Sequence, residues 1–400
     1  MARILCLCSR PPYPPNDGAR VRMYNLAKEL ARNHEVDVVA ISKDDEYETP
    51  NNEFRSYRIF EEHPIRFYVR GVRSLFSRDP IQCRTYLSPK VKRWVDEHIE
   101  EYDLVYCTHL ATVKYVEDHN TLKVLDLVDA VSNNFSEFVT DSSFVWQLIY
   151  RIESKRASRY ETYAADLFDR SIITTDTDRQ HIDSDNIVVV PNGVTDAVFE
   201  YNLSVPDTRE VVFLGDLSYL PNETAVKWYA EEIFPLVRDA VPESTFKIVG
   251  KSPSKNIRKL AENDGITVTG FVDDPYEHVR DARVSVAPVQ IGGGIQNKVL
   301  EAMGLGTPVV TTKFGATGIN VTEGTDLLIR DEPQAFARAV VDILENCELA
   351  EILSKNAREL IKQQYTWESA GDVLNEQVDQ ILSTRPQRNL DTNLTNDEIQ

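Results

Sequence analysis

Short apolar runs alternate along this chain with longer segments in which apolar residues recur every third or fourth position. RILCLCS (3–9) predicts a buried strand, and GARVRMYNLAKELARN (18–33) has the spacing of an amphipathic helix. VDVVAIS (36–42) predicts the next strand. Further strands are predicted at 103–109, 123–128, 171–175 and 186–193, with a long helical pattern at 142–170. This alternation is typical of a parallel sheet covered by helices.

A second series of strands follows, spaced like βα units. These strands are predicted at 211–218, 245–252, 266–273, 283–289 and 307–312. The fold class is therefore α/β, with two doubly wound Rossmann-like domains facing a cleft. We expect an N-terminal domain at 1–200, a polar linker at 201–210 and a C-terminal domain at 211–365. Residues 384–400 lack periodic apolar positions and predict a disordered tail.

Composition narrows the range of functions. The 400 residues, 42% of them hydrophobic, suffice for two cores, and no apolar run approaches the roughly 18 residues of a membrane span. We therefore expect a cytoplasmic protein. Acidic residues outnumber basic ones 64 to 44, for a formal charge of -20, which argues against nucleic-acid binding because phosphate chains are repelled. An acidic surface of this kind also suits a proteome adapted to high salt.

Residues 65–93 depart from this acidity. Eight basic residues lie there among aromatic and aliphatic ones: Arg66, Arg70, Arg73, Arg78, Arg84, Lys90, Lys92 and Arg93, among Phe67, Tyr68, Leu75 and Phe76. Such a segment can attract anionic lipid headgroups at the inner face of a membrane, or it can be an ordinary solvated helix face. Both interpretations stay open.

Three consecutive glycines, Gly292 to Gly294, separate the strand predicted at 283–289 from a helix that begins near Asn297. Glycine destabilises strands and helices, so the run indicates a place where the backbone comes close to a ligand. The unpaired amides of Ile295, Gln296 and Asn297, together with the helix dipole, predict an anion site. Lys298 adds a full positive charge, which suits a diphosphate.

Glu301 lies one turn further along the same helix face, where its carboxylate can accept hydrogen bonds from the adjacent hydroxyls of a ribose. Gly306 and Pro308 should end this helix. The alternative is a glycine-rich turn followed by an exposed Lys298–Glu301 pair of little energetic consequence.

Several motifs together resemble those of glycosyltransferase family 4. They are RPPYPPNDGARVR, VVVPNGVTDAVF, FLGDLSYLPNETAV, GFVDD and GGGIQNKVLEAMGLGTPVV, spread over nearly the whole chain. Within that family the chain is most similar to predicted sugar transferases linked to envelope polysaccharide or sorting systems. The motifs are specific for the family but not for its sugar.

The resemblance implies a GT-B fold, an acceptor-binding first domain, a nucleotide-sugar-binding second domain and a helix at 366–383 that packs back onto the first domain. It implies transfer with retention of configuration, from a UDP- or GDP-linked sugar, to a glycan or lipid-linked acceptor in polysaccharide or glycoprotein assembly. No cofactor and no metal are expected. By resemblance, Gly18, Gly215, Phe271, Val272 and the 293–298 segment border the donor, and Arg22 assists near the phosphate.

The chain departs from the family pattern at three positions. Of the usual two glutamates eight positions apart, Glu301 is present and Gly293 replaces the other; Asp216 and Asn222 replace a usual Arg and Lys. Lys298 is then the best remaining cation for the leaving group.

Other polar residues follow strands that should end at the cleft. Asp129 stands where many relatives have a histidine, and it either binds the donor sugar or attacking hydroxyl or caps a helix. His109 closes another strand and can exchange a proton near neutral pH. Asp176 and Asp178 suggest a turn or cap rather than a metal site, and Asn192 with Gly193 a tight turn.

Two other functions remain open at this point. The first is a nucleotide-sugar epimerase of related build, which needs no acceptor. The second is a noncatalytic nucleotide-sugar-binding partner, which the missing cations would permit.

Overall fold

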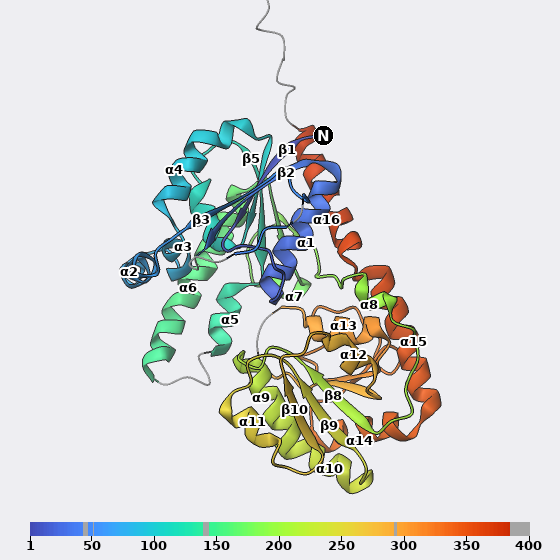
Figure 1. The fold of residues 1–400 in the computed structure, drawn as a ribbon. Coiled ribbons are helices and arrows are strands. Elements are labelled where there is room, and N and C mark those ends of the chain that lie inside the picture. The colour runs from blue at the N-terminus through green and yellow to red at the C-terminus, as the bar shows by residue number, and fades with distance from the viewer. Residues whose placement is uncertain (43–46, 51, 139–143, 292–293, 385–400) are drawn as a thin grey trace, which may run out of the picture.

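The computed structural model describes residues 1–42, 47–50, 52–138, 144–291 and 294–384. Two parallel sheets, each covered by helices, form two domains stacked end to end (Figure 1). The predicted fold class, two doubly wound α/β domains, is confirmed.

The first domain contains a seven-stranded sheet in the order β3-β2-β1-β4-β5-β6-β7. Its strands are β1 (Arg3–Cys8), β2 (Glu35–Ser42), β3 (Ser56–Glu61), β4 (Leu104–Thr108), β5 (Leu122–Val128), β6 (Arg170–Ile173) and β7 (Ile187–Val189). All pairings are parallel. The strand order reverses between β1 and β4, so the loops after these two strands open at a switch point.

The second domain contains a six-stranded parallel sheet in the order β10-β9-β8-β11-β12-β13. Its strands are β8 (Glu210–Leu214), β9 (Thr245–Val249), β10 (Ile266–Gly270), β11 (Val284–Ala287), β12 (Val309–Thr311) and β13 (Leu328–Ile329). Here the switch point lies between β8 and β11.

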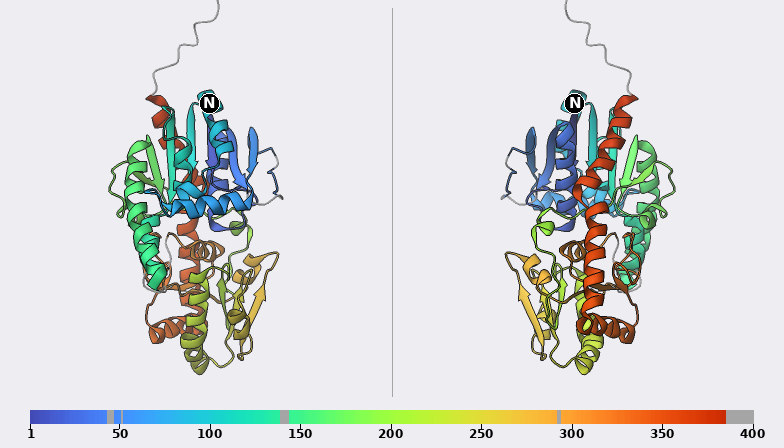
Figure 2. Two further views of the ribbon diagram at one scale, coloured as in Figure 1. Left: turned by 90° about the vertical axis from the view of Figure 1, so that its left-hand side faces the viewer. Right: turned by 90° about the vertical axis from the view of Figure 1, so that its right-hand side faces the viewer.

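Helices cover both faces of each sheet (Figures 1 and 2). In the first half they are α1 (Gly18–Asn33), α2 (Pro64–Ser74), α3 (Ile81–Thr85), α4 (Pro89–His98), α5 (Val131–Phe138), α6 (Phe144–Leu167), α7 (Asp176–Arg179) and α8 (Ala197–Glu200), with 3-10 turns η1 (Ile99–Glu101) and η2 (Leu110–Tyr115). In the second half they are α9 (Leu220–Trp228), the π-helical turn η3 (Tyr229–Ile233), α10 (Phe234–Ala240), α11 (Lys255–Leu260), α12 (Pro275–Arg280), α13 (Asn297–Leu305), α14 (Pro333–Glu345), α15 (Cys347–Gln364) and α16 (Trp367–Ser383). Within the described residues, none of these helices has the length and apolarity of a membrane span.

The last two helices run along one side of both domains (Figure 2). α16 packs on α1 so closely that a Cβ at Gly371 would lie 2.5 Å from the Glu29 Cβ. Asn375 Nδ2 donates to the Glu29 carbonyl oxygen at 3.2 Å. At the start of α16, Gly193 permits a second close approach, because a Cβ there would lie 2.3 Å from the Trp367 nitrogen.

The boundaries differ from the sequence predictions mainly at strand ends. β8 stops at Leu214 and β7 at Val189, several residues before the predicted ends, because the following residues turn toward the cleft. Two strands were not predicted: β3, a half-exposed edge strand, and β13, of two residues. The tail prediction for 384–400 falls, apart from Thr384, outside the described residues.

Candidate functional site

Loops at the carboxyl ends of strands from both sheets meet across the domain boundary. The loops in contact follow β1, β5 and β7 in the first domain and β9 and β11 in the second. The β1 loop leads to α1, whose N-cap Asp17 accepts a hydrogen bond from the Arg20 amide at 3.1 Å. A Cβ at Gly18 would lie 3.7 Å from the Asn297 Nδ2, at the start of α13. The sheet topology thus brings Gly18 to the glycine-rich segment.

Gly294 and Asp129 meet across the domain boundary. Gly294 has φ +72°, and a Cβ on it would lie 2.4 Å from Asp129 Oδ1. Asp129 follows β5 and accepts a hydrogen bond from Thr174 Oγ1 at 3.1 Å. Burial, and next the nearby Asp178 carboxylate, raise the Asp129 pKa to about 6. The side chain does not cap α5: it is held against the glycine loop of the other domain.

The first backbone amides at the amino end of α13 have no described partner. Within the described part of the chain, no acceptor takes a hydrogen bond from the backbone amides of Ile295, Gln296 or Asn297. The Gln296 side chain makes no capping bond either. Unpaired amides at a helix start can bind an anion, so the anion site stays a prediction that these contacts permit. Gly292 and Gly293 lie outside the described residues.

Lys298 points across the carboxyl end of β8. Its Nζ donates to Asn222 Oδ1 at 2.8 Å and Gln296 Oε1 at 3.0 Å, and it lies 5.6 Å from the centre of the Phe213 ring. It forms no ion pair with Glu301 or any other described carboxylate, so the simple helix-pair interpretation is wrong. Burial lowers the Lys298 pKa to about 8, with Glu301 opposing the shift. The ammonium is therefore mostly charged at neutral pH and has only neutral partners.

Glu301 lies one turn deeper and accepts a hydrogen bond from the Tyr276 hydroxyl at 3.3 Å. Burial raises its pKa to about 7, against the opposing effects of Tyr276 and Lys298. Leu300, Met303 and Leu305 are buried beneath the helix. Gly306 ends it with φ +82°, as predicted.

A chain of hydrogen bonds links the first domain's core to α13. Arg22 is 1% exposed and its guanidinium contacts the Asp126 carboxylate at 2.8 Å. Its Nη1 donates to Asn192 Oδ1 at 3.0 Å, and Asn192 Nδ2 donates to Asn297 Oδ1 at 2.9 Å. The expectation that Arg22 assists at the phosphate is wrong, because its charge is neutralised in the core. Asn192 instead bridges the domains.

His109 ends at the cleft with φ +72°, and its Nδ1 accepts from the Ala111 amide at 3.4 Å. Burial, and next the charge of Arg10, lower its pKa to about 4. The expectation of proton exchange near neutral pH is therefore wrong for the free protein, since the imidazole is already neutral there. It remains able to form hydrogen bonds.

Comparisons with known proteins agree with this arrangement. The family model described as "Glycosyltransferase Family 4" matches residues 16–198, and that described as "Glycosyl transferases group 1" matches 208–346. An uncharacterized 44.6 kDa protein in the cps region of Klebsiella pneumoniae is 21% identical over 91% of this chain and 97% of its own length. An uncharacterized glycosyltransferase of Methanocaldococcus jannaschii is 26% identical over 37% of this chain and 39% of its own.

Solved structures share the whole fold. A sucrose-phosphate synthase from Thermosynechococcus elongatus superimposes with a TM-score of 0.71, at 16% identity, over 96% of this chain and 100% of that one. TarM of S. aureus, in a complex that includes UDP, gives 0.70 at 14% identity over 96% and 100%. Anabaena HepE with UDP and glucose gives 0.66 at 17% identity over 95% and 100%. The two family models therefore cover the two domains in chain order, and the whole chain shares the two-domain fold of the solved structures.

The protein is a GT-B glycosyltransferase.

The glycosyltransferase brings together most of the residues singled out from sequence. Gly18, Asp129, Gly294, Asn297 and the 295–298 amides meet at the domain boundary. Gly215, after β8, packs beside Asn222, since a Cβ there would lie 2.9 Å from the Asn222 Nδ2. Asn222 was singled out only because it replaces a basic residue of the family pattern. In the structure its side-chain oxygen accepts a hydrogen bond from Lys298 and so orients that side chain.

Phe271 and Val272 lie further out. Phe271 is 75% exposed beside a hollow of about 360 Å³ that Arg258 and Gly270 also line. Val272 packs partly on the second domain's core. Nothing in their contacts assigns a ligand to them.

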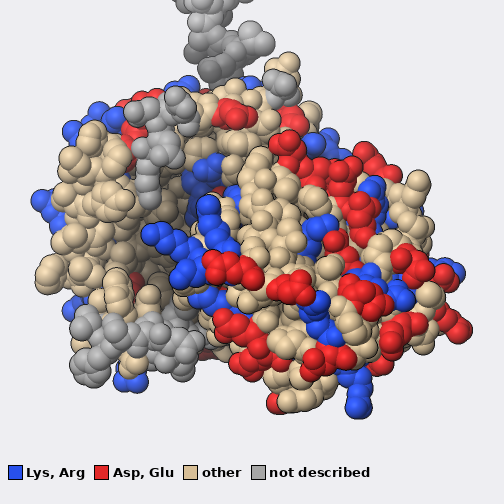
Figure 3. Space-filling model, turned by 60° about the horizontal axis from the view of Figure 1, so that its bottom comes forward, with Lys and Arg blue, Asp and Glu red and all other residues tan. Residues whose placement is uncertain are grey.

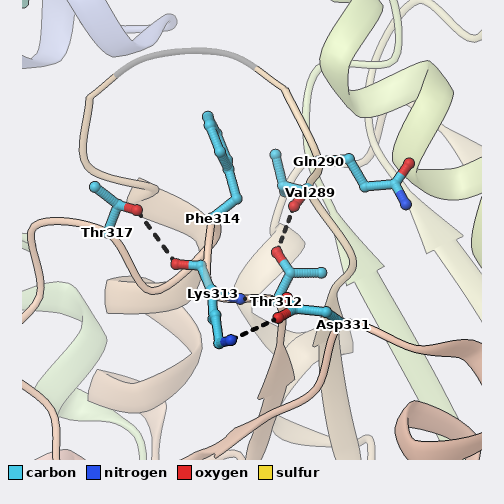
Figure 4. Close-up of a pocket in the computed structure, with 7 residues that line it drawn as sticks. All are labelled: Val289, Gln290, Thr312, Lys313, Phe314, Thr317 and Asp331. Carbon is cyan, nitrogen blue, oxygen red and sulfur yellow. Dashed lines mark hydrogen bonds and ion pairs between the residues drawn. The ribbon is translucent and has the colours of Figure 1, made fainter.

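A second hollow, of about 450 Å³, opens beyond the ends of β11 and β12 and was not predicted (Figure 4). Gln290, Thr312 and Phe314 line it, and Lys313 Nζ lies 3.5 Å from Asp331 Oδ2 on its floor. The one sequence signal near this hollow was the predicted end of the strand at 307–312.

Basic side chains gather at the cleft of the glycosyltransferase, although the chain is acidic overall. Figure 3 shows the molecule hollowed between its two parts, with Lys and Arg along the hollow and Asp and Glu spread over the adjoining surface. Lys251 is one cation that sequence reasoning missed: its Nζ donates to the Asn16 carbonyl oxygen at 2.8 Å, across the domains.

Asp176 and Asp178 lie in the first turn of α7, whose N-cap is Thr175, so the cap is next to them and not made by their own side chains. Asp178 accepts from Thr175 Oγ1 at 2.6 Å, and its amide donates back to that oxygen at 2.9 Å. Asp176 pairs with Arg179 on the surface at 2.9 Å. The Asp178 carboxylate also accepts a hydrogen bond from the Ala130 amide at 3.3 Å, which ties α7 to the loop after β5.

Proposed function

We propose that the protein transfers a sugar, with retention of configuration, from a UDP- or GDP-linked donor to a glycan or lipid-linked acceptor in cell-surface polysaccharide or glycoprotein assembly, on the cytoplasmic side of the membrane. The contact of Asp129 with Gly294 carries this proposal. It sets a carboxylate of the first domain against the open helix start of the second, where a diphosphate and an acceptor would meet.

The departing diphosphate is bound by the amides of Ile295, Gln296 and Asn297 and by Lys298. Breaking the bond to the anomeric carbon concentrates negative charge on the leaving oxygen, so fixed donors there lower the barrier. The ammonium has only neutral partners in the free protein and needs no carboxylate removed before it binds phosphate. Glu301 accepts hydrogen bonds from the ribose hydroxyls. No metal ion or cofactor is part of the proposal.

In the transfer step the acceptor oxygen bonds to the anomeric carbon while the carbon–diphosphate bond breaks. The acceptor proton passes to the departing diphosphate oxygen. Asp129 accepts a hydrogen bond from the donor sugar or the attacking hydroxyl. His109, neutral at the end of β4, provides a second hydrogen-bonding group. Retention rests on the family resemblance.

The comparisons support the class of donor and pathway. TarM and HepE were solved in complexes that include UDP, and HepE was also solved with UDP-glucose. The Klebsiella relative is named for a cps region. An envelope polysaccharide is the corresponding product class for this chain.

Calorimetric titration with UDP and GDP tests the donor site. Replacing a charge-assisted contact costs about 1.5–3 kcal/mol, so Lys298→Ala should bind the preferred diphosphate about 10- to 100-fold more weakly. Lys355→Ala, at an exposed position of α15, is the matched control and should bind normally. Equal affinity in Lys298→Ala and the wild type would refute the site.

Product analysis tests the reaction itself. The donor sugar should be transferred only when acceptor is present, and activity should survive treatment with a metal chelator. Conversion of the donor to an isomeric nucleotide sugar without acceptor would identify an epimerase instead.

A further inference from the structure

Helix α2 turns its apolar side outward. Ile65, Val69, Val72 and Phe76 follow the spacing of one helical face that continues just past the helix end, and they are 66%, 43%, 61% and 90% exposed. Surface helices normally direct such a stripe into the core. On α2 only Phe67 and Ser74 are buried, on the opposite side.

Helix α6 extends the same surface. Leu148, Ile152 and Tyr163 are exposed along one of its sides. The two helices are joined directly, because Arg156 Nη2 donates to the Leu75 carbonyl oxygen at 3.0 Å. Figures 1 and 2 show α2 and α6 on the same side of the first domain.

Exposed apolar residues are concentrated here. Of the seventeen large hydrophobic residues exposed in the described chain, six lie within 65–76 and four within 146–163, which makes ten. A cluster of this kind on a soluble surface indicates a binding partner.

The charge beside this surface is positive. Arg66 and Arg73 flank the α2 stripe, and Lys155 and Arg159 stand beside the α6 residues. Among the described residues no carboxylate lies within ion-pair distance of these four side chains. Other basic residues of the 65–93 segment are neutralised: Arg70 by Glu62 and Arg84 by Asp79, for example. Those residues are already engaged in ion pairs within the protein, whereas the outward stripe of α2 is apolar and exposed.

We infer that α2 and the adjoining side of α6, called here the docking face, bind the surface of an anionic lipid bilayer. Aromatic and aliphatic side chains would enter the headgroup region, while the unpaired guanidinium and ammonium groups contact lipid phosphates. Local charge favours lipid phosphates over a second copy of this chain, because a symmetric contact between two docking faces would set the unpaired basic side chains of one copy against those of the other. The inference goes beyond the proposed function and does not require it, because binding to lipid needs neither donor nor transfer.

Flotation of the full chain with vesicles tests the docking face. Vesicles of phosphatidylcholine alone are compared with vesicles that also contain phosphatidylglycerol, over a salt series. The wild type should float with the anionic vesicles, and less so as salt rises. Arg66→Gln with Arg73→Gln should weaken this binding about 30-fold, from roughly fivefold per basic residue. Val72→Asp with Phe76→Ser should abolish it.

The control pair is Ile352→Ser with Lys355→Gln, an exposed apolar and an exposed basic residue on α15. It should float like the wild type, and all variants should keep the wild-type melting temperature and diphosphate affinity. Failure of the wild type to bind anionic vesicles, or equal loss in the control, would overturn the inference. So would a dimer in sedimentation that the α2 variants dissolve while vesicles bind nothing, since the face would then join two copies of the chain.

Discussion

Gly294→Ala perturbs the contact on which the proposed function depends, in two separable ways. The first is backbone strain: at φ +72° an L-residue costs roughly 1–2 kcal/mol relative to glycine. The second is steric. The added methyl carbon would lie 2.4 Å from Asp129 Oδ1, 3.0 Å from its Cγ and 3.2 Å from its Oδ2. Forcing atoms into a packed site costs about 1–3 kcal/mol.

Asp129→Ala separates these costs, because the three nearest atoms all belong to the Asp129 side chain beyond its Cβ. In that background Gly294→Ala should retain only the backbone cost. Urea denaturation of the four proteins forms a double-mutant cycle, with an expected coupling of about 1–3 kcal/mol. Because the two residues belong to different domains, the clash can also be relieved by opening the cleft. UDP and GDP affinity should therefore be measured in the same four proteins, and a weaker affinity should appear only where Asp129 is intact.

Additive effects in both stability and nucleotide affinity would refute the reasoning. They would mean that Gly294 and Asp129 do not touch in solution, and that the second domain's glycine loop is not held against the first domain's carboxylate.

Three further predictions concern groups around this contact. The profile of kcat/KM against pH should be bell-shaped, rising as the Asp129 carboxyl ionises near pH 6 and the Glu301 carboxyl near pH 7, and falling as Lys298 loses its proton near pH 8. Asp129→Asn should remove only the part of the acid limb near pH 6. Asp129→Asn should also raise the melting temperature at pH 8 more than at pH 4. The pKa of Asp129 is raised on folding, so ionisation of this carboxyl destabilises the native state as pH rises through about 6. An equal change at both pH values would contradict this. Arg22→Met should lower the free energy of unfolding by about 3–5 kcal/mol, because it leaves the Asp126 carboxylate buried and unpaired. Adding Asp126→Leu should recover much of that loss in urea denaturation. A cost below about 1 kcal/mol for the single change would show that the pair is not buried in solution.

Much of the fold was predictable from the sequence. Most strands, such as β1 and β2, were identified as short continuous apolar runs, because these segments are buried on both faces of a parallel sheet. β3 was missed because an edge strand covered on one side alternates weakly, and β13 because two residues make no pattern. The start of α13 at Asn297 and its end at Gly306 were predictable because both depend on local backbone chemistry.

Within the site, sequence reasoning correctly predicted where residues lie when that place follows from position along a strand or helix. The open amides before α13 and the placement of Asp129 and His109 at strand ends are of this kind. It failed where a side chain's state depends on its surroundings. Arg22 was expected near phosphate, yet Asp126, more than a hundred positions away, holds it in the core. The pKa of His109 could not be predicted either, because burial and Arg10 lower it.

The sequence by itself determined two parallel-sheet domains and the glycine turn with its following lysine and glutamate, because each depends on near neighbours in the chain. Only the tertiary structure decided that Gly294 meets Asp129, that Asn192 joins Arg22 to Asn297, and that Asn222 holds the Lys298 ammonium. Each of these contacts joins segments whose distance in space is fixed by the packing of sheets and domains, and no local pattern of residues encodes that distance.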